Sequence, residues 1–221
     1  MKKIIYLLLI ALAVSCGGPS RTEKAARDQH LRDSIARAEF IRDSTARAEH
    51  IADSLARDEA RRTVIERCRP LFNETKDEFS DKVFFEPKNA PKYRNRNGVY
   101  CYFVCIGDKP AALRFVFQYH NDSWLFIRNL QFNCDGTNFT VTPDMDTDCG
   151  NGGMIWEWCD ELVRASGTAI SEPYIALIAN SQSVKVRMNG SQYYDTRTLT
   201  REQIQGIKDA YDYYLALGGE F

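Results

Sequence analysis

The clearest pattern of apolar and polar positions is a repeat of ten residues that fills positions 27–61. Copies begin at Arg32, Arg42 and Ala52, and each carries an Asp-Ser pair and an Ala-Arg pair at the same places. Neither glycine nor proline occurs at positions 21–69, and the frequent alanine and arginine residues are strong helix formers. The pattern therefore predicts one long helix.

The charged residues of the repeat are spaced to support this helix. An aspartate precedes an arginine by four residues, the better orientation for an ion pair, in Asp28–Arg32, Asp33–Arg37, Asp43–Arg47 and Asp53–Arg57. Each exposed pair contributes only about 0.3–0.5 kcal/mol, so the helix depends on several of them together.

Larger apolar residues also recur along the repeat, at Leu31, Ile35, Ile41, Ile51 and Leu55. With the intervening Ala38, Thr45 and Ala48 included, their spacing averages about 3.3 residues per turn, shorter than in a straight helix. We weigh a solvated single helix against a weakly self-associating coiled coil, and favour the single helix because Thr45 and the alanines make a poor seam. In either case the segment is a spacer, and some 40 helical residues span about 60 Å.

Beyond position 62 the pattern becomes that of a folded domain. The helical spacing continues to about position 80, with a kink or restart expected at Pro70. Hairpins are indicated by Asn133-Cys134-Asp135-Gly136 and by Asn189-Gly190. Strands are expected where apolar residues alternate or run together between turn signals, at 83–86, 99–106, 112–119, 124–132, 138–142, 155–158, 184–188 and 191–194.

Two helices are expected in the second half of this domain. One begins at Ser171-Glu172-Pro173 and runs to about Asn180. The other follows the capping box formed by Thr200 and Gln203 and ends at Gly218. The expected fold class is therefore α+β, with an antiparallel sheet and helices packed on one face, preceded by a helical spacer and a signal peptide.

The first residues have the pattern of a secretory signal. A short basic start is followed at positions 4–14 by an apolar run that is too short to cross a bilayer. The run ends in Ala13-Val14-Ser15-Cys16-Gly17-Gly18, which resembles the lipobox of bacterial lipoproteins. The resemblance implies that the Cys16 thiol is lipidated and that the chain is cleaved before Cys16. The alternative is an ordinary signal peptide with an incidental cysteine.

These patterns divide the chain into four segments. They are a lipoprotein signal peptide at 1–15, the lipidated cysteine and a flexible tether at 16–22, the charged helix of the repeat at 23–63, and an α+β domain at 64–221. Two or more acyl chains would anchor the protein stably in a membrane. The tether carries no acidic cluster of the kind that marks some surface lipoproteins, so we favour the periplasmic side over the cell surface.

Charge and cysteine content narrow the chemistry of the domain. A net charge of −1, from 29 basic and 30 acidic residues, gives no sign of a nucleic-acid partner. Six cysteines follow Cys16, an even number that allows up to three disulfides in an oxidising compartment. A Cys134–Cys149 disulfide is favoured because it would close the polar loop between them, and six reduced, buried thiols are the alternative.

The domain contains few residues that could act in catalysis or bind a metal ion. His120 is the single histidine of the domain and falls in a predicted turn, and no Gly-x-Ser-x-Gly or phosphate-binding glycine motif is present. Residues 144–148 resemble the start of a calcium loop, but Cys149 and Ile155 occupy the places of the required glycine and glutamate. Glu157 lies between two tryptophans, and we expect it to pair with Arg187 or Arg114 rather than to act in catalysis. No catalytic residue, metal ligand or cofactor is predicted.

A second resemblance covers roughly residues 76–218. It is carried by Trp124-Leu125-Phe126-Ile127, Asp135-Gly136, Trp156-Glu157 and Arg187-x-x-Gly190-x-x-Tyr193-Tyr194-Asp195. These residues resemble a small domain of uncharacterised bacterial and phage-encoded envelope proteins. The resemblance implies a single domain and no particular chemistry.

Together these features predict a lipid-anchored cell-envelope protein that presents a binding or structural domain on a helical spacer. Its expected partners are a membrane, through the anchor, and an envelope protein or glycan that a tyrosine-rich end would suit (Tyr193, Tyr194, Tyr211, Tyr213 and Tyr214). The alternative is an envelope hydrolase that uses Glu157 and the carboxylates of residues 144–148. A third hypothesis is weak self-assembly through the spacer.

Overall fold

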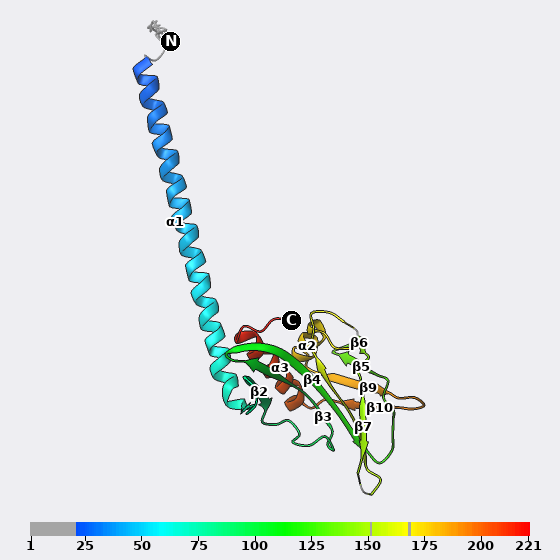
Figure 1. Ribbon diagram of the computed structural model, residues 1–221. Coiled ribbons are helices and arrows are strands. Elements are labelled where there is room, and N and C mark those ends of the chain that lie inside the picture. Colours follow the sequence, from blue (N-terminus) through cyan, green and yellow to red (C-terminus); the bar gives the residue numbers. More distant parts are fainter. Residues whose placement is uncertain (1–20, 151, 168) are drawn as a thin grey trace, which may run out of the picture. The chain divides into compact units, whose positions relative to one another are not determined.

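The computed structural model describes residues 21–150, 152–167 and 169–221, and the predicted signal peptide and Cys16 lie outside them. The chain divides into two compact units, one that ends at Ala56 and one that runs from Arg57 to Phe221. Figure 1 shows the helices and strands, most of them labelled.

Helix α1, Arg21–Cys68, contains the whole repeat, and the side chains at positions 24–63 are exposed. The predicted ion pair between Asp43 and Arg47 is present at 3.7 Å. Because these side chains are 71% and 80% exposed, the pair stabilises the helix little. Local hydrogen bonds repeat with the sequence, since Ser34 Oγ and Ser44 Oγ each donate to the carbonyl three residues earlier at 2.8 Å.

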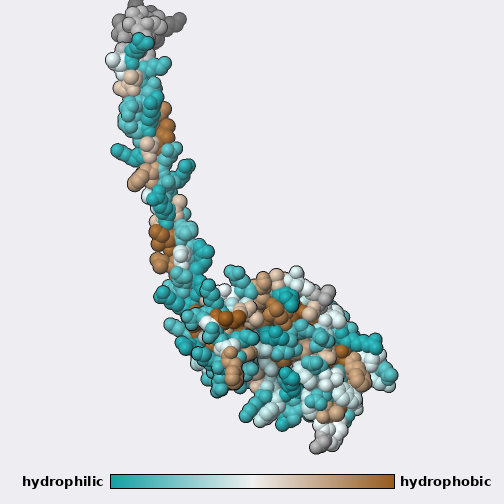
Figure 2. All heavy atoms as spheres, viewed as in Figure 1, coloured by the Kyte–Doolittle hydropathy of each residue, from teal (hydrophilic) through white to brown (hydrophobic). Residues whose placement is uncertain are grey.

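The apolar residues of the repeat do not form a straight stripe. Ten residues are not a whole number of turns, so each copy is rotated by about 80° from the one before. Figure 2 shows brown residues on the right edge of the helix in its upper part and on the left edge lower down. Leu31, Ile41 and Leu55 are each more than half exposed. A straight helix therefore carries no continuous apolar seam along the repeat, and the choice between a single helix and a coiled coil stays a prediction.

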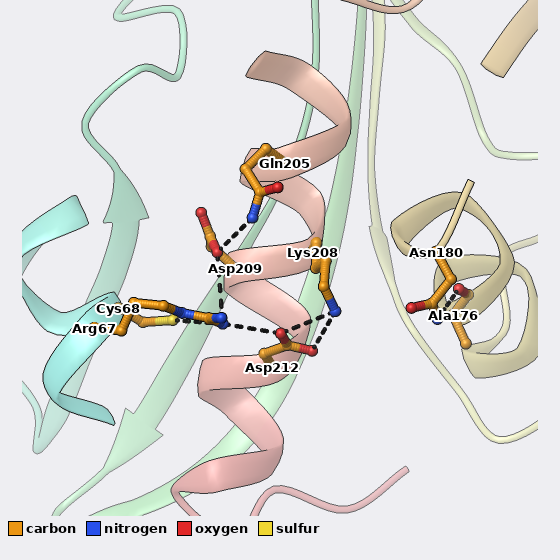
Figure 3. Close-up of polar contacts among 8 residues, drawn as sticks. All are labelled: Arg67, Cys68, Ala176, Asn180, Gln205, Lys208, Asp209 and Asp212. Carbon is orange, nitrogen blue, oxygen red and sulfur yellow. Dashed lines mark hydrogen bonds and ion pairs between the residues drawn. The ribbon is translucent and has the colours of Figure 1, made fainter. Parts of the chain in front are cut away.

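The last turn of α1 is fixed within the second unit. Arg67 Nη2 donates to Asp212 Oδ2 at 3.0 Å and lies 3.8 Å from Asp209 Oδ1, both on helix α3, Arg201–Ala216 (Figure 3). Asp209 is buried, and Cys68 beside Arg67 is fully buried. The end of α1 is therefore part of the folded domain, and a short 3-10 helix, Arg69–Leu71, follows at Pro70.

The described residues form ten strands in two antiparallel sheets. The six-stranded sheet has the order β1 (Phe72–Lys76), β2 (Lys82–Pro87), β3 (Gly98–Ile106), β4 (Lys109–Asn121), β8 (Ile155–Leu162), β7 (Asp146–Cys149). The four-stranded sheet has the order β10 (Tyr194–Thr198), β9 (Val184–Asn189), β5 (Asn129–Cys134), β6 (Thr137–Val141). The chain thus passes between the sheets three times, after β4, after β6 and after β8.

Aromatic side chains join these layers. On the inner face of the six-stranded sheet, Phe103 meets Tyr213 of α3 edge to face, with ring centroids 5.2 Å apart. Helix α2, Glu172–Ala179, covers part of the other sheet, where Tyr174 stacks on Phe139 at 4.3 Å. Phe115 and Phe132 bring the two sheets into contact at 6.3 Å. One continuous core results, which is the usual solution for an α+β domain.

The α+β fold class with antiparallel strands and packed helices is confirmed. The capping box at Thr200 and Gln203 is present, and Asp135 and Gly136 form the predicted hairpin turn, with φ of 48° and 94°. Several details of the predicted fold were wrong. The strands form two sheets instead of one, the helical pattern does not continue past Leu71, and a four-residue loop rather than a two-residue turn follows Asn189.

Candidate functional site

The largest hollow among the described pockets lies on the outer face of the six-stranded sheet. Side chains alternate between the faces of a strand, so Cys101 and Phe103 point into the core while Tyr100 and Tyr102 point away from it. The loop at 88–97, between β2 and β3, forms one wall. We call this hollow the outer-face cleft, and its volume is ≈ 890 Å³.

The floor of the outer-face cleft is aromatic. Tyr100 and Tyr102 of β3 are half-buried, and Trp158 of β8 is buried beneath the guanidinium of Arg94, which lies 4.7 Å from its ring centroid. Burial raises the pKa of Tyr100 to about 12, and burial together with the nearby Asp160 raises the pKa of Tyr102. Both phenol groups therefore keep their protons, and remain hydrogen-bond donors, throughout the physiological pH range.

A rigid carboxylate lies beside these rings. Asp160 Oδ1 accepts from Arg114 Nε at 2.6 Å, and its Oδ2 accepts from the Tyr102 hydroxyl at 2.9 Å. Arg114 also donates to the backbone carbonyl of Asp160 at 2.5 Å. The three residues come from three neighbouring strands, so the sheet itself fixes their positions. Such a charge-assisted cluster offers pre-oriented oxygen atoms to a ligand.

Gln118 of β4 also lines the outer-face cleft. Its side chain is 3% exposed, and its Oε1 is the one buried side-chain polar atom without a hydrogen-bond partner within the described parts of the chain. A buried acceptor left without a donor costs about 1–3 kcal/mol. Gly98 and Pro91 are close by, since a Cβ on Gly98 would lie 3.1 Å from Gln118 Oε1 and 2.6 Å from Pro91 Cγ. A buried acceptor of this kind needs a donor that the described residues do not supply.

Glu157, the predicted partner of Arg187 or Arg114, pairs with neither. Its Oε1 accepts from the backbone nitrogens of Leu125 and Phe126, at 2.7 and 2.9 Å, and its Oε2 accepts from Ile127 at 2.7 Å. Arg114 binds Asp160 instead, and Arg187 lies 4.9 Å from the ring centroid of Tyr194.

Glu157 contacts backbone amides instead of an arginine because of the path that the chain takes between the two sheets. The predicted strand at 124–132 begins only at Asn129, and residues 122–128 form the β4–β5 connection. Phe126 has φ 51°, a left-handed conformation that no strand contains, and this turns consecutive amides toward one carboxylate. Glu157 is fully buried. It therefore anchors the β4–β5 connection and cannot meet a substrate as a general acid or base.

The remaining predicted site residues do not converge. Asp146 and Asp148 belong to the edge strand β7, and Asp144 donates its backbone amide to Glu161 Oε1 at 2.7 Å. Within the described residues, no group of three or more His, Cys, Asp or Glu side chains is placed to hold a metal ion. His120 is half-buried at the end of β4, where its amide donates to Asn97 Oδ1.

The tyrosine-rich end predicted from the sequence is divided between two places. Tyr213 and Tyr214 are buried in the core on α3, and Tyr211, also on α3, donates its hydroxyl to Glu172. Tyr193 and Tyr194 are exposed, at 73% and 66%, beside the loop between β9 and β10. A single tyrosine surface is therefore not formed.

The cysteines of the domain are free thiols. Cys134 is buried on β5 of the four-stranded sheet, and Cys149 is exposed on β7 at the edge of the other sheet. The disulfide between them is not formed in this structure and stays a prediction for the oxidised protein. Burial raises the pKa of Cys101 and of Cys159, the latter to about 12, so neither is a reactive thiolate.

The residues of the outer-face cleft were not singled out from the sequence. Their signal is an alternation of period two, with Tyr100 and Tyr102 on one strand and Trp158 and Asp160 on another. Among the residues that the structure describes, none of the helices is long and apolar enough to cross a membrane. No protein-family model, curated protein or solved structure matches the chain.

Proposed function

We propose that this chain is a lipid-anchored cell-envelope protein that presents a ligand-binding domain on a helical spacer. The observation that carries the proposal is the order of the parts: a lipobox-like sequence ending in Cys16, then a repeat whose residues are all exposed, then a domain with a cleft. A helical segment whose side chains are all exposed contributes no packing, and we infer that it separates what lies at its two ends. We place the protein on the periplasmic side of the membrane.

The outer-face cleft supports a binding role. It combines aromatic rings, which can stack on a ligand, with a fixed carboxylate and an unsatisfied amide oxygen, which can orient the ligand by hydrogen bonds. Of the carboxylates on which the hydrolase alternative depended, Glu157 has both oxygens occupied by backbone amides, and Asp146 and Asp148 lie exposed on the edge strand β7. Binding without reaction is therefore the function we propose.

We expect Cys16 to carry the lipid. Cells that express the full chain and are fed an alkyne-tagged fatty acid should yield a labelled protein, and Cys16→Ser should yield none. Cys149→Ser, which removes an exposed thiol of the domain, is the matched control and should be labelled like the parent. Label that persists in the Cys16→Ser protein would contradict the proposal.

We also expect the spacer to act as a single helix. A peptide of residues 20–65 should sediment as a monomer at every concentration tested, because the apolar positions turn by about 80° with each copy and give no continuous seam. Sedimentation equilibrium measures this directly. A mass that rises with concentration would instead support self-assembly through the spacer.

A further inference from the structure

We propose that the outer-face cleft binds a neutral saccharide that carries an N-acetyl group. The inference rests on the proposed function and deepens it, because it names the class of ligand that the domain binds. It is carried by the aromatic floor, by the balance of charges around the cleft, and by the unsatisfied oxygen of Gln118.

The aromatic floor fits the flat, hydrogen-bearing face of a sugar ring. Trp158 offers such a surface, and its present neighbour is the guanidinium of the exposed Arg94, at 4.7 Å from the ring centroid. A sugar ring would take the place of this guanidinium. The polar edge of the same sugar would then face Asp160, whose carboxylate is held by Arg114 and Tyr102 and can accept from hydroxyl groups.

The charges around the cleft favour a neutral ligand over an ionic one. Three acidic and three basic residues line it: Glu74, Glu86, Asp160, Lys88, Lys92 and Arg94. The basic groups are already engaged, since Lys88 Nζ donates to the carbonyl of Pro70 at 2.7 Å, Arg94 covers Trp158, and Lys92 Nζ lies 5.4 Å from the ring centroid of Tyr93. No set of free cations converges here among the described residues, so the cleft lacks what a phosphate or a polyanion would need.

Gln118 offers a hydrogen-bond acceptor to an amide. Its Oε1 has no donor among the described residues, and the N–H of an N-acetyl group can donate to it. Gln118 lies beside Pro91, which belongs to the same loop as Arg94. The displacement that frees the ring of Trp158 would therefore also open the way to Gln118. One movement of the loop at 88–97 would expose both groups to the sugar.

The test measures saccharide binding to the detergent-solubilised full chain by isothermal titration calorimetry. A β-1,4-linked tetramer of N-acetylglucosamine should bind, and the corresponding glucose tetramer, which has a hydroxyl in place of each N-acetyl group, should bind at least tenfold more weakly. No measurable binding of the acetylated tetramer, or equal binding of the two, would overturn the proposal. A sulfated oligosaccharide that binds more tightly than both would overturn it as well.

Two variants place the ligand in the cleft. Gln118→Met removes the acceptor and keeps the size, so binding should weaken about tenfold while the thermal midpoint stays the same or rises. Gln131→Met, on β5 of the other sheet, is the matched control and should change neither affinity nor midpoint by a measurable amount. Unchanged affinity in Gln118→Met would overturn the assignment. Arg94→Ala, at an exposed loop position, should bind more tightly because the competing guanidinium is gone, and unchanged or weaker binding would contradict the site.

The outcome is distinguishable from that of the lipidation experiment. If the chain is labelled at Cys16 but binds no saccharide, the lipid anchor is supported and the saccharide site is contradicted. If the chain binds the acetylated tetramer but carries no lipid, the saccharide site is supported and the lipid anchor is contradicted.

Discussion

Replacing Glu157 by alanine is expected to lower the free energy of unfolding by about 3–5 kcal/mol. The substitution leaves three backbone amides of the β4–β5 connection without the carboxylate that accepts from them at 2.7–2.9 Å. Each buried donor left unsatisfied costs about 1–3 kcal/mol, and partial hydration of the exposed Phe126 limits the sum. Urea unfolding followed by tryptophan fluorescence measures the change.

A milder variant and a neighbouring control separate this effect from the loss of any surface charge. Glu157→Gln keeps one acceptor oxygen but turns an NH₂ group toward an amide donor, so we expect a loss of about 2 kcal/mol. Glu161→Ala removes a partly exposed carboxylate on the same strand that accepts from one exposed amide, and should cost less than about 1 kcal/mol. Equal losses in Glu157→Ala and Glu161→Ala would show that the amide contacts are not what stabilises the connection.

Replacing Gly190 by alanine is expected to destabilise the domain by about 3–4 kcal/mol. A Cβ at this position would lie 2.0 Å from the carbonyl oxygen of Leu125 and 2.9 Å from its carbonyl carbon. These are backbone atoms of the β4–β5 connection, which Glu157 already holds, so they cannot move aside as a side chain would. The same unfolding measurement applies.

Gly107 supplies the control for this second variant. It lies in the turn between β3 and β4 with φ 59°, and a Cβ there would meet nothing within 4 Å. Gly107→Ala should therefore cost only about 1 kcal/mol, from the left-handed backbone alone. A Gly190→Ala protein as stable as Gly107→Ala would mean that the loop between β9 and β10 can leave Leu125 without penalty.

The fold elements that sequence patterns predicted well are those in which the signal is local. The ten-residue repeat, the capping box at Thr200 and the turn at Asp135-Gly136 each depend on residues a few positions apart. The segment at 124–132 was misread because its alternation of aromatic and aliphatic residues is that of a strand. The left-handed backbone at Phe126 has no counterpart in the residue types.

The contacts of Glu157 and of the outer-face cleft were even less predictable, because they depend on residues far apart in the sequence. Glu157 was recognised as unusual, but its partners are backbone amides, which every residue except proline carries, so no pairing rule between side chains could have found them. Tyr102 and Asp160 form a hydrogen bond although they are 58 positions apart in the sequence, and Arg114 and Asp160 are 46 positions apart. Only the order of the strands brings them together, and that order was not predictable while the strands were assigned to a single sheet.

The absence of buried side chains at positions 24–63 has a consequence for how this protein can vary by descent. One copy more or fewer would alter the length of the helix by about 15 Å, and no buried contact at positions 24–63 would be lost. The length of the spacer can therefore change by whole repeats without altering the packing of the domain that follows it.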